Sequence, residues 1–147
     1  MGGGACITPI DCMRRKQSHL GSSLFWNSTF TPGKDDPGIN ALHDILSSDA
    51  RANPDFFDYN HVYLRYCSGD LWTGTRTYFD KFGLWFSGHR NIEATMRHLK
   101  RFQNLDRATH ILLVGISAGG WGVFSNADFF TDKWLPRSVV FREVPVA

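Results

Sequence analysis

An aliphatic run that passes directly into a glycine-flanked serine restricts the possible folds of this chain. Residues 110–122 read HILLVGISAGGWG, with Gly115 and Gly119 two positions either side of Ser117. The run THILLVG is short and does not alternate between polar and apolar residues, which is typical of a strand covered on both faces. Residues 118 to about 130 suit a helix, so the pattern predicts a strand, a sharp turn and a helix.

The serine in this turn has a mechanical interpretation. A strand that enters a helix with almost no loop strains the backbone of the middle residue, and flanking glycines leave room for the two segments. Ser117 would stand at the carboxyl edge of the sheet, beside the Ala118 amide at a helix N-terminus that favours negative charge. A nucleophile beside such donors is what acyl transfer requires. The alternative is a glycine-rich turn in which Ser117 only caps the helix.

The rest of the chain predicts an α/β architecture. Apolar residues recur at helical spacing over residues 89–102, after a start at Ser87-Gly88. Residues 1–40 are predicted to be loop, and residues 41–50 a short helix. Residues 61–66, HVYLRY, are predicted to form a strand, and residues 138–141 a last strand. The order strand, helix, strand, helix, strand implies a parallel sheet with right-handed crossovers.

Size and charge narrow the class of protein. The 147 residues, 42% of them hydrophobic, fit one globular domain. A net charge of +2, with no basic cluster beyond residues 14–16, argues against nucleic acid as a partner. No apolar stretch approaches the roughly 18–20 residues of a membrane span, and the first residues lack the pattern of a secretion signal.

The cysteines and the N-terminal glycines each allow two interpretations. Cys6 and Cys12 could form a short-loop disulfide that leaves Cys67 alone, or all three cysteines could be reduced thiols of a cytosolic protein. Gly2-Gly3-Gly4-Ala5 is similar to the glycine-rich oxyanion loop of esterases, in which backbone N–H groups hold the tetrahedral intermediate. Three glycines at the start of a chain are also typical of a cloning linker.

Five segments in order resemble the pectin acetylesterase and Notum family over about residues 2–130. They are GGGACIT-x-x-DC at 2–12, LGSS at 20–23, NPDFFDYNHVYLRYCSGDLWTG at 53–74, FSGHRNIEATMRHL at 86–99 and ILLVGISAGGWGVFSNAD at 111–128. The resemblance implies a secreted α/β-hydrolase with a mostly parallel sheet and flanking helices. It also implies hydrolysis of carboxylic esters by a Ser, Asp, His triad without metal or cofactor, on acetylated polysaccharide or acylated protein.

The resemblance assigns roles to particular residues. Ser117 becomes the nucleophile, and the amides of Gly4, Ala5 and Ala118 become the oxyanion hole. The family usually has tryptophan at the position of Ala5, which spares a backbone donor but widens the pocket. Cys6 and Cys12 match a local disulfide, and Cys67 matches a cysteine whose partner lies upstream of the glycines.

The chain lacks an evident acid and base. All six histidines precede Ser117, whereas the hydrolase order is serine, acid, histidine. We therefore expect residues 1–147 to be a single partial domain without its N-terminal strands and its acid–base half, with little activity alone. The alternatives are a non-catalytic remnant or binding module that keeps the pocket, and a small α/β protein whose glycine turn binds an anion. Oligomeric state and acyl preference are not predicted.

Four further residues are candidates near the site. Asp70 either lines the pocket or, as the preferred interpretation, fixes its own loop by accepting backbone hydrogen bonds. The tryptophans either form apolar walls of the pocket or pack in the core; they are Trp72, Trp85 and Trp121.

Overall fold

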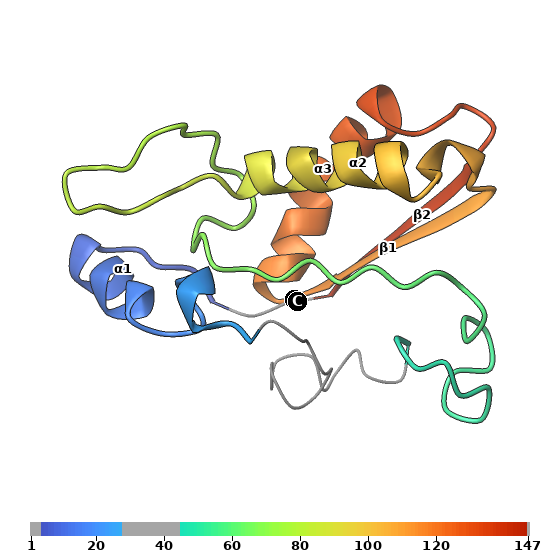
Figure 1. Cartoon of the computed structure of the whole chain (residues 1–147), viewed down its shortest axis with the longest axis horizontal. Coiled ribbons are helices and arrows are strands. Elements are labelled where there is room, and N and C mark those ends of the chain that lie inside the picture. The colour runs from blue at the N-terminus through green and yellow to red at the C-terminus, as the bar shows by residue number, and fades with distance from the viewer. Residues whose placement is uncertain (1–3, 28–44, 147) are drawn as a thin grey trace.

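The computed structural model describes residues 4–27 and 45–146 (Figure 1). Its elements in chain order are helix α1 (Pro9–Lys16), helix α2 (Gly88–Phe102), strand β1 (His110–Ile116), helix α3 (Ala118–Lys133) and strand β2 (Val140–Val146). Single 3₁₀ turns occur at Ser23–Phe25 and Leu105–Arg107. The fold is mixed α/β, with a small parallel sheet and flanking helices.

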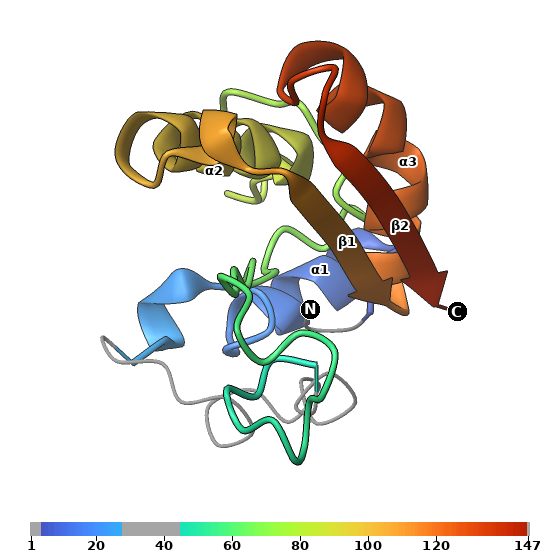
Figure 2. The ribbon, with the colours of Figure 1, turned by 90° about the vertical axis from the view of Figure 1, so that its right-hand side faces the viewer.

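The two strands and helix α3 form one βαβ unit, as the sequence predicts. β1 pairs in parallel with β2, from His110 opposite Val140 to Ile116 opposite Val146. Figure 2 shows the strands side by side with α3 along them. Because the strands are parallel, their carboxyl ends meet at one edge, and Ser117 follows β1 there.

Three predicted segments are wrong in the described residues. Residues 1–40 are predicted as loop, but Pro9–Lys16 form helix α1, because the Thr8 side chain caps the helix by accepting from Asp11 N and Pro9 suits its first turn. Residues 61–66 have no regular secondary structure, because no other described segment pairs with them and a strand needs a partner for its N–H and C=O groups. Residues 45–50 of the predicted 41–50 helix form turns and bends, while residues 41–44 lie outside the described part. The final strand starts two residues later than predicted and continues to Val146.

The core lies where the 64–72 segment meets α2 and α3. Trp72 is 1% exposed and stacks on Tyr66, with ring centroids 4.9 Å apart. The other buried members of this cluster are Ile92, Met96, Ala118, Phe130 and Trp134. The indole of Trp72 occupies the space that a Cβ at Gly122 would need, so glycine lets the 70–74 loop pack directly on α3.

A bridging carboxylate joins α2 to α3. Glu93 Oε1 accepts hydrogen bonds from Arg97 Nη2 at 2.8 Å and from Lys133 Nζ at 3.1 Å. The bond from Arg97, followed by that from Lys133, lowers the pKa of Glu93 to about 2. The ionised form therefore helps to hold the two helices together.

Glu93→Gln is expected to lower the melting temperature by about 1–3 °C at neutral pH, because it replaces a half-buried charged acceptor by a neutral one. A folded pKa below the ordinary value of 4.5 gives stability that is complete above pH 4.5 and lost as pH falls to about 2. Thermal melts of both proteins across this range test this. Glu143→Gln, an exposed change on β2, is the control. A difference independent of pH would contradict the assignment.

Candidate active site

Ser117 occupies a strained turn between β1 and α3. Its φ is 54° and its ψ is −122°, a backbone conformation that residues with a side chain rarely adopt. Its N–H donates to the Val146 carbonyl at 2.9 Å, and its carbonyl accepts from Trp121 N at 3.1 Å. The side chain is exposed. The turn therefore presents the hydroxyl to solvent at the carboxyl edge of the sheet.

Glycines around the turn are required by close backbone approaches. A Cβ at Gly115 would overlap the Gly119 carbonyl, so the strand and the helix can reverse direction only without that side chain. A Cβ at Gly120 would overlap the carbonyl of Val146 at the end of β2. The structure thus contains the strained turn that the glycine spacing predicts, and its geometry depends on both strands.

The start of α3 places Ala118, one of the predicted oxyanion donors, directly after Ser117. Ala118 is the first residue of this 16-residue helix and is buried. N–H groups in the first turn of a helix lack intrahelical acceptors, and the helix dipole adds partial positive charge there. An oxygen that develops negative charge next to Ser117 would be stabilised at this position.

The other two predicted donors lie in the segment before α1. Cys6 N donates to the Gly69 carbonyl at 3.1 Å, and Cys6 forms a disulfide with Cys12. Figures 1 and 2 place the described start of the chain close to the carboxyl ends of β1 and β2. Gly4 has a φ of 81° and Ala5 is half-buried. The role of these two amides toward Ser117 remains a prediction.

Asp70 fixes the loop that carries Gly69 and Trp72. Its Oδ1 accepts from Ser68 Oγ at 2.6 Å and from Trp72 N at 3.1 Å. Its Oδ2 accepts from the N–H of Gly88, the first residue of α2, at 2.8 Å. Asp70 thereby caps α2 from a distant loop, which agrees with the preferred interpretation of this residue.

Asn126 is a structural residue that the sequence analysis missed. It is buried in α3, and its Nδ2 donates to Gly122 O at 2.8 Å and to Trp72 O at 3.3 Å. Its Oδ1 lies 2.6 Å from His89 Nδ1 on α2. Asn126 therefore joins α2, α3 and the 70–74 loop. Only its spacing of four residues from Gly122 on the buried face of α3 could have indicated this.

No histidine within residues 4–27 and 45–146 hydrogen bonds to the Ser117 hydroxyl. His110 begins β1, about 20 Å of strand away from Ser117. His89 on α2 is half-buried against Asn126 and Phe129. His43 lies outside the described residues. The remaining histidines are exposed; they are His19, His61 and His98. The described residues therefore show no histidine paired with the candidate nucleophile.

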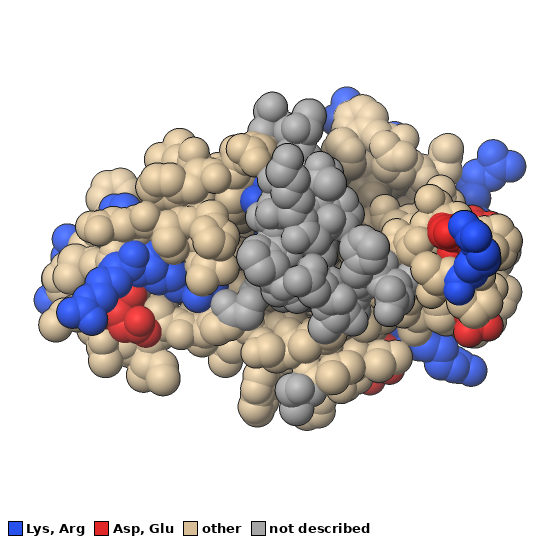
Figure 3. Space-filling model, turned by 90° about the horizontal axis from the view of Figure 1, so that it is seen from below, with Lys and Arg blue, Asp and Glu red and all other residues tan. Residues whose placement is uncertain are grey.

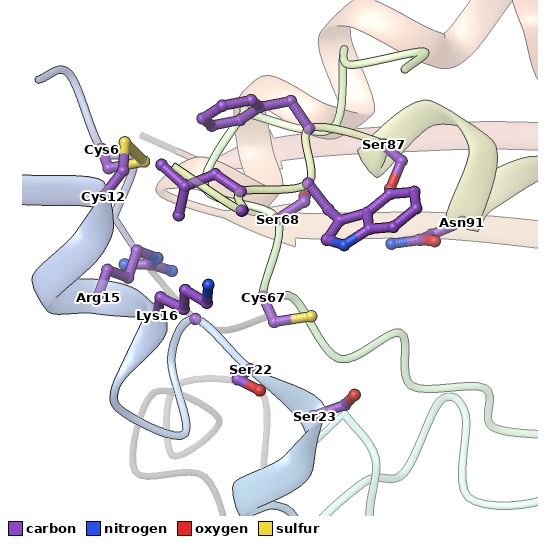
Figure 4. Close-up of a pocket in the computed structure, with 15 residues that line it drawn as sticks. Cys6, Cys12, Arg15, Lys16, Ser22, Ser23, Cys67, Ser68, Ser87 and Asn91 are labelled. Atoms are coloured by element: carbon purple, nitrogen blue, oxygen red, sulfur yellow. A yellow bond between two sulfur atoms is a disulfide. The ribbon is translucent and has the colours of Figure 1, made fainter. Parts of the chain in front are cut away.

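The three tryptophans separate into different environments. Trp72 belongs to the core, whereas Trp121 is 60% exposed one helical turn after Ser117. Trp85 lines a cavity of about 230 Å³ together with the Cys6–Cys12 disulfide, Arg15, Lys16 and Cys67 (Figure 4). Cys67 is not disulfide-bonded, and burial raises the pKa of its thiol. Ser117 does not line this cavity.

The described residues contain neither a candidate metal site nor a membrane-spanning helix. No group of three or more His, Cys, Asp or Glu side chains among them could hold a metal ion. None of their helices combines the length and the apolar character needed to cross a membrane.

Comparison with known proteins identifies the class to which this fold and serine turn belong. The chain matches the pectinacetylesterase family over residues 1–147 and belongs to that family. It is 38% identical to the palmitoleoyl-protein carboxylesterase NOTUM of Schmidtea mediterranea over 129 residues, and this match covers 86% of this chain. It is 33% identical over 143 residues, or 96% of its length, to pectin acetylesterase 4 of Arabidopsis thaliana. The family is thus one of carboxylesterases.

A solved structure has the same fold. The crystal structure of the Wnt deacylase Notum from Drosophila matches 98% of this chain with a TM-score of 0.79 and 32% identity. The chain spans 22% of the Schmidtea protein, 32% of the Arabidopsis protein and 41% of the Drosophila structure. It is therefore similar to a limited part of each relative.

Proposed function

We propose that Ser117 is the nucleophile of a carboxylic ester hydrolase. The observation that carries this is the strained, exposed serine between β1 and α3 in a chain of the pectinacetylesterase family. A serine that only capped α3 would accept a hydrogen bond from the first turn, but the Ser117 side chain makes no such bond. The capping alternative is therefore not favoured.

The proposed reaction has two steps. Ser117 Oγ bonds to the ester carbonyl carbon as its proton leaves, and the carbonyl electron pair moves onto oxygen. The amides of Ala118, Gly4 and Ala5 hold that oxyanion until the pair returns and the bond to the leaving oxygen breaks, and that oxygen takes up the proton that Ser117 lost and departs as the alcohol. Water then attacks the acyl-serine in the same way and releases the acid. Neither step needs a metal or a cofactor.

Each step also needs a proton acceptor, and no described histidine hydrogen bonds to Ser117. We propose that the base and its acid partner come from outside these residues and that the chain alone reacts slowly. Oxyanion stabilisation without the triad still gives a residual rate. The competing proposal, a non-catalytic binding module, would keep the cavity but show no reaction at Ser117.

A fluorophosphonate probe tests the nucleophile directly. We expect slow, stoichiometric modification of Ser117, located by peptide mass spectrometry. Ser117→Ala should abolish it, whereas Ser125→Ala, an exposed serine on the same helix, should not change it. Modification of other serines at the same rate, or none at Ser117 in folded protein, would contradict the proposal and favour the binding module.

Substrate and location follow from the family as proposals. The relatives are named as deacylases of palmitoleoylated protein or as pectin acetylesterases, so we propose an acylated protein or an acetylated polysaccharide as substrate. The Cys6–Cys12 disulfide supports an oxidising compartment, and we propose that the parent protein is extracellular.

A further inference from the structure

Residues 75–86 form a projecting hairpin, called here the aromatic loop. Arg76 N donates to Phe86 O and Asp80 N donates to Leu84 O, each at 3.0 Å, so the two arms run together. Asp80 Oδ1 accepts from Phe82 N at 2.9 Å and from Leu84 N at 3.0 Å, which fixes the tip. Figure 1 shows the loop extending beyond the N-terminal end of α2.

The aromatic loop exposes four large rings. The exposed fractions are 64% for Tyr78, 60% for Phe79, 36% for Phe82 and 52% for Trp85. Phe79 and Trp85 meet edge to face across the arms, with centroids 5.9 Å apart. Single exposed apolar residues are ordinary, but a contiguous group on one projecting loop marks an interaction surface.

Positive charge surrounds these rings. Lys81 Nζ lies 5.1 Å from the Phe82 centroid, and the Arg76 guanidinium carbon lies 5.9 Å from that of Tyr78. Lys16, the last residue of α1, places its Nζ beside Gly83 at the tip. Figure 3 shows Lys and Arg side chains, beside acidic ones, at the end of the molecule where α1 lies, and further Lys and Arg side chains at the opposite end. The carboxylate of Asp80 is turned to the backbone amides of the tip.

We propose that the aromatic loop binds the surface of an anionic phospholipid bilayer. The phenylalanine rings have no hydrogen-bonding group for a polar partner, and a projecting tip can enter a soft interface that a flat patch cannot. Tyrosine and tryptophan favour the boundary between headgroups and acyl chains. Lys16, Arg76 and Lys81 stand where they would meet the lipid phosphates and carboxylates. The proposal does not depend on the chemistry of Ser117.

Vesicle co-sedimentation of the 147-residue chain tests the proposal. We expect binding to phosphatidylcholine vesicles that contain phosphatidylserine, and weaker binding to phosphatidylcholine alone or at high salt. The double change Phe79→Ser and Phe82→Ser should weaken binding at least about tenfold, because two apolar groups no longer enter the interface. Lys81→Gln should weaken it about fivefold, and only when phosphatidylserine is present.

Matched controls lie at the opposite end of α2. Phe102 is 58% exposed and has Arg101 over its ring, but it stands about 20 Å along the helix from the aromatic loop. Phe102→Ser and Arg101→Gln should leave vesicle binding unchanged. Circular dichroism melts show whether each variant is folded. As a second measurement, vesicles that contain brominated lipids should quench the tryptophan fluorescence of the wild-type chain more than that of the Trp85→Phe variant.

Three results would overturn the proposal. One is the absence of binding by folded protein to vesicles of either composition. Another is an equal loss of binding in the loop variant and in Phe102→Ser. The third is that the chain does not bind vesicles but is retained on an immobilised acidic polysaccharide, and that this retention is lost in the Phe79→Ser and Phe82→Ser double variant. This result would assign the loop to a different partner.

Discussion

Trp72→Ala is expected to lower the free energy of unfolding by about 3–5 kcal/mol, which is a large part of the stability of a domain of this size. The indole is 1% exposed, stacks on Tyr66 and fills the space above Gly122. No nearby side chain can take its place, because Gly122 has none. Its removal therefore leaves a cavity between the 70–74 loop and α3.

Urea denaturation followed by circular dichroism measures this loss without relying on tryptophan fluorescence. Trp121→Ala is the matched control, because Trp121 is 60% exposed and its removal should cost less than about 1 kcal/mol. A similar loss in the two variants would show that Trp72 is not the centre of the core.

Asp70→Ala is expected to lower the free energy of unfolding by about 3 kcal/mol. Three donors lose a charged acceptor together: the Ser68 hydroxyl and the amides of Trp72 and Gly88. Hydrogen bonds to charged groups contribute about 1.5–3 kcal/mol each, and the partial exposure of Asp70 allows water to replace some of them. Asp70→Asn keeps acceptor capacity on one oxygen and should lose about half as much.

Hydrogen exchange gives this prediction a local readout. The Gly88 amide should exchange faster in Asp70→Ala, because the start of α2 loses its cap. Asp128→Ala, an exposed carboxylate on α3, should change neither stability nor exchange at Gly88. Unchanged protection of Gly88 would mean that Asp70 does not cap the helix.

The features that the sequence predicted are those with local causes. The 110–122 stretch contains its own glycines and its own change of periodicity, so β1, the turn at Ser117 and α3 follow from adjacent residues. Helix α2 is equally local, because its apolar spacing and its start at Ser87-Gly88 lie within sixteen residues.

Helix α1 has local causes, the Thr8 cap and Pro9, but is absent from the prediction of loop over residues 1–40. The other features that the sequence did not predict depend on distant partners. Asp70 caps a helix that begins 18 residues later, and Asn126 meets a histidine 37 residues earlier. Residues 61–66 have the composition of a strand, but strand formation depends on a neighbour that composition does not supply. The same holds for Trp72, whose core position is fixed by Gly122 on another element.

The hydrogen bond from Ser117 N to Val146 O has a consequence for how reactivity arises. It closes only after β2 has returned across α3 to lie beside β1, a long-range step that comes late in folding. Before that step the local bond from Trp121 N to Ser117 O is the remaining backbone hydrogen bond of the serine, and an unfolded chain offers an ordinary, inert alcohol. A covalent probe of Ser117 would then count folded molecules in a mixed sample.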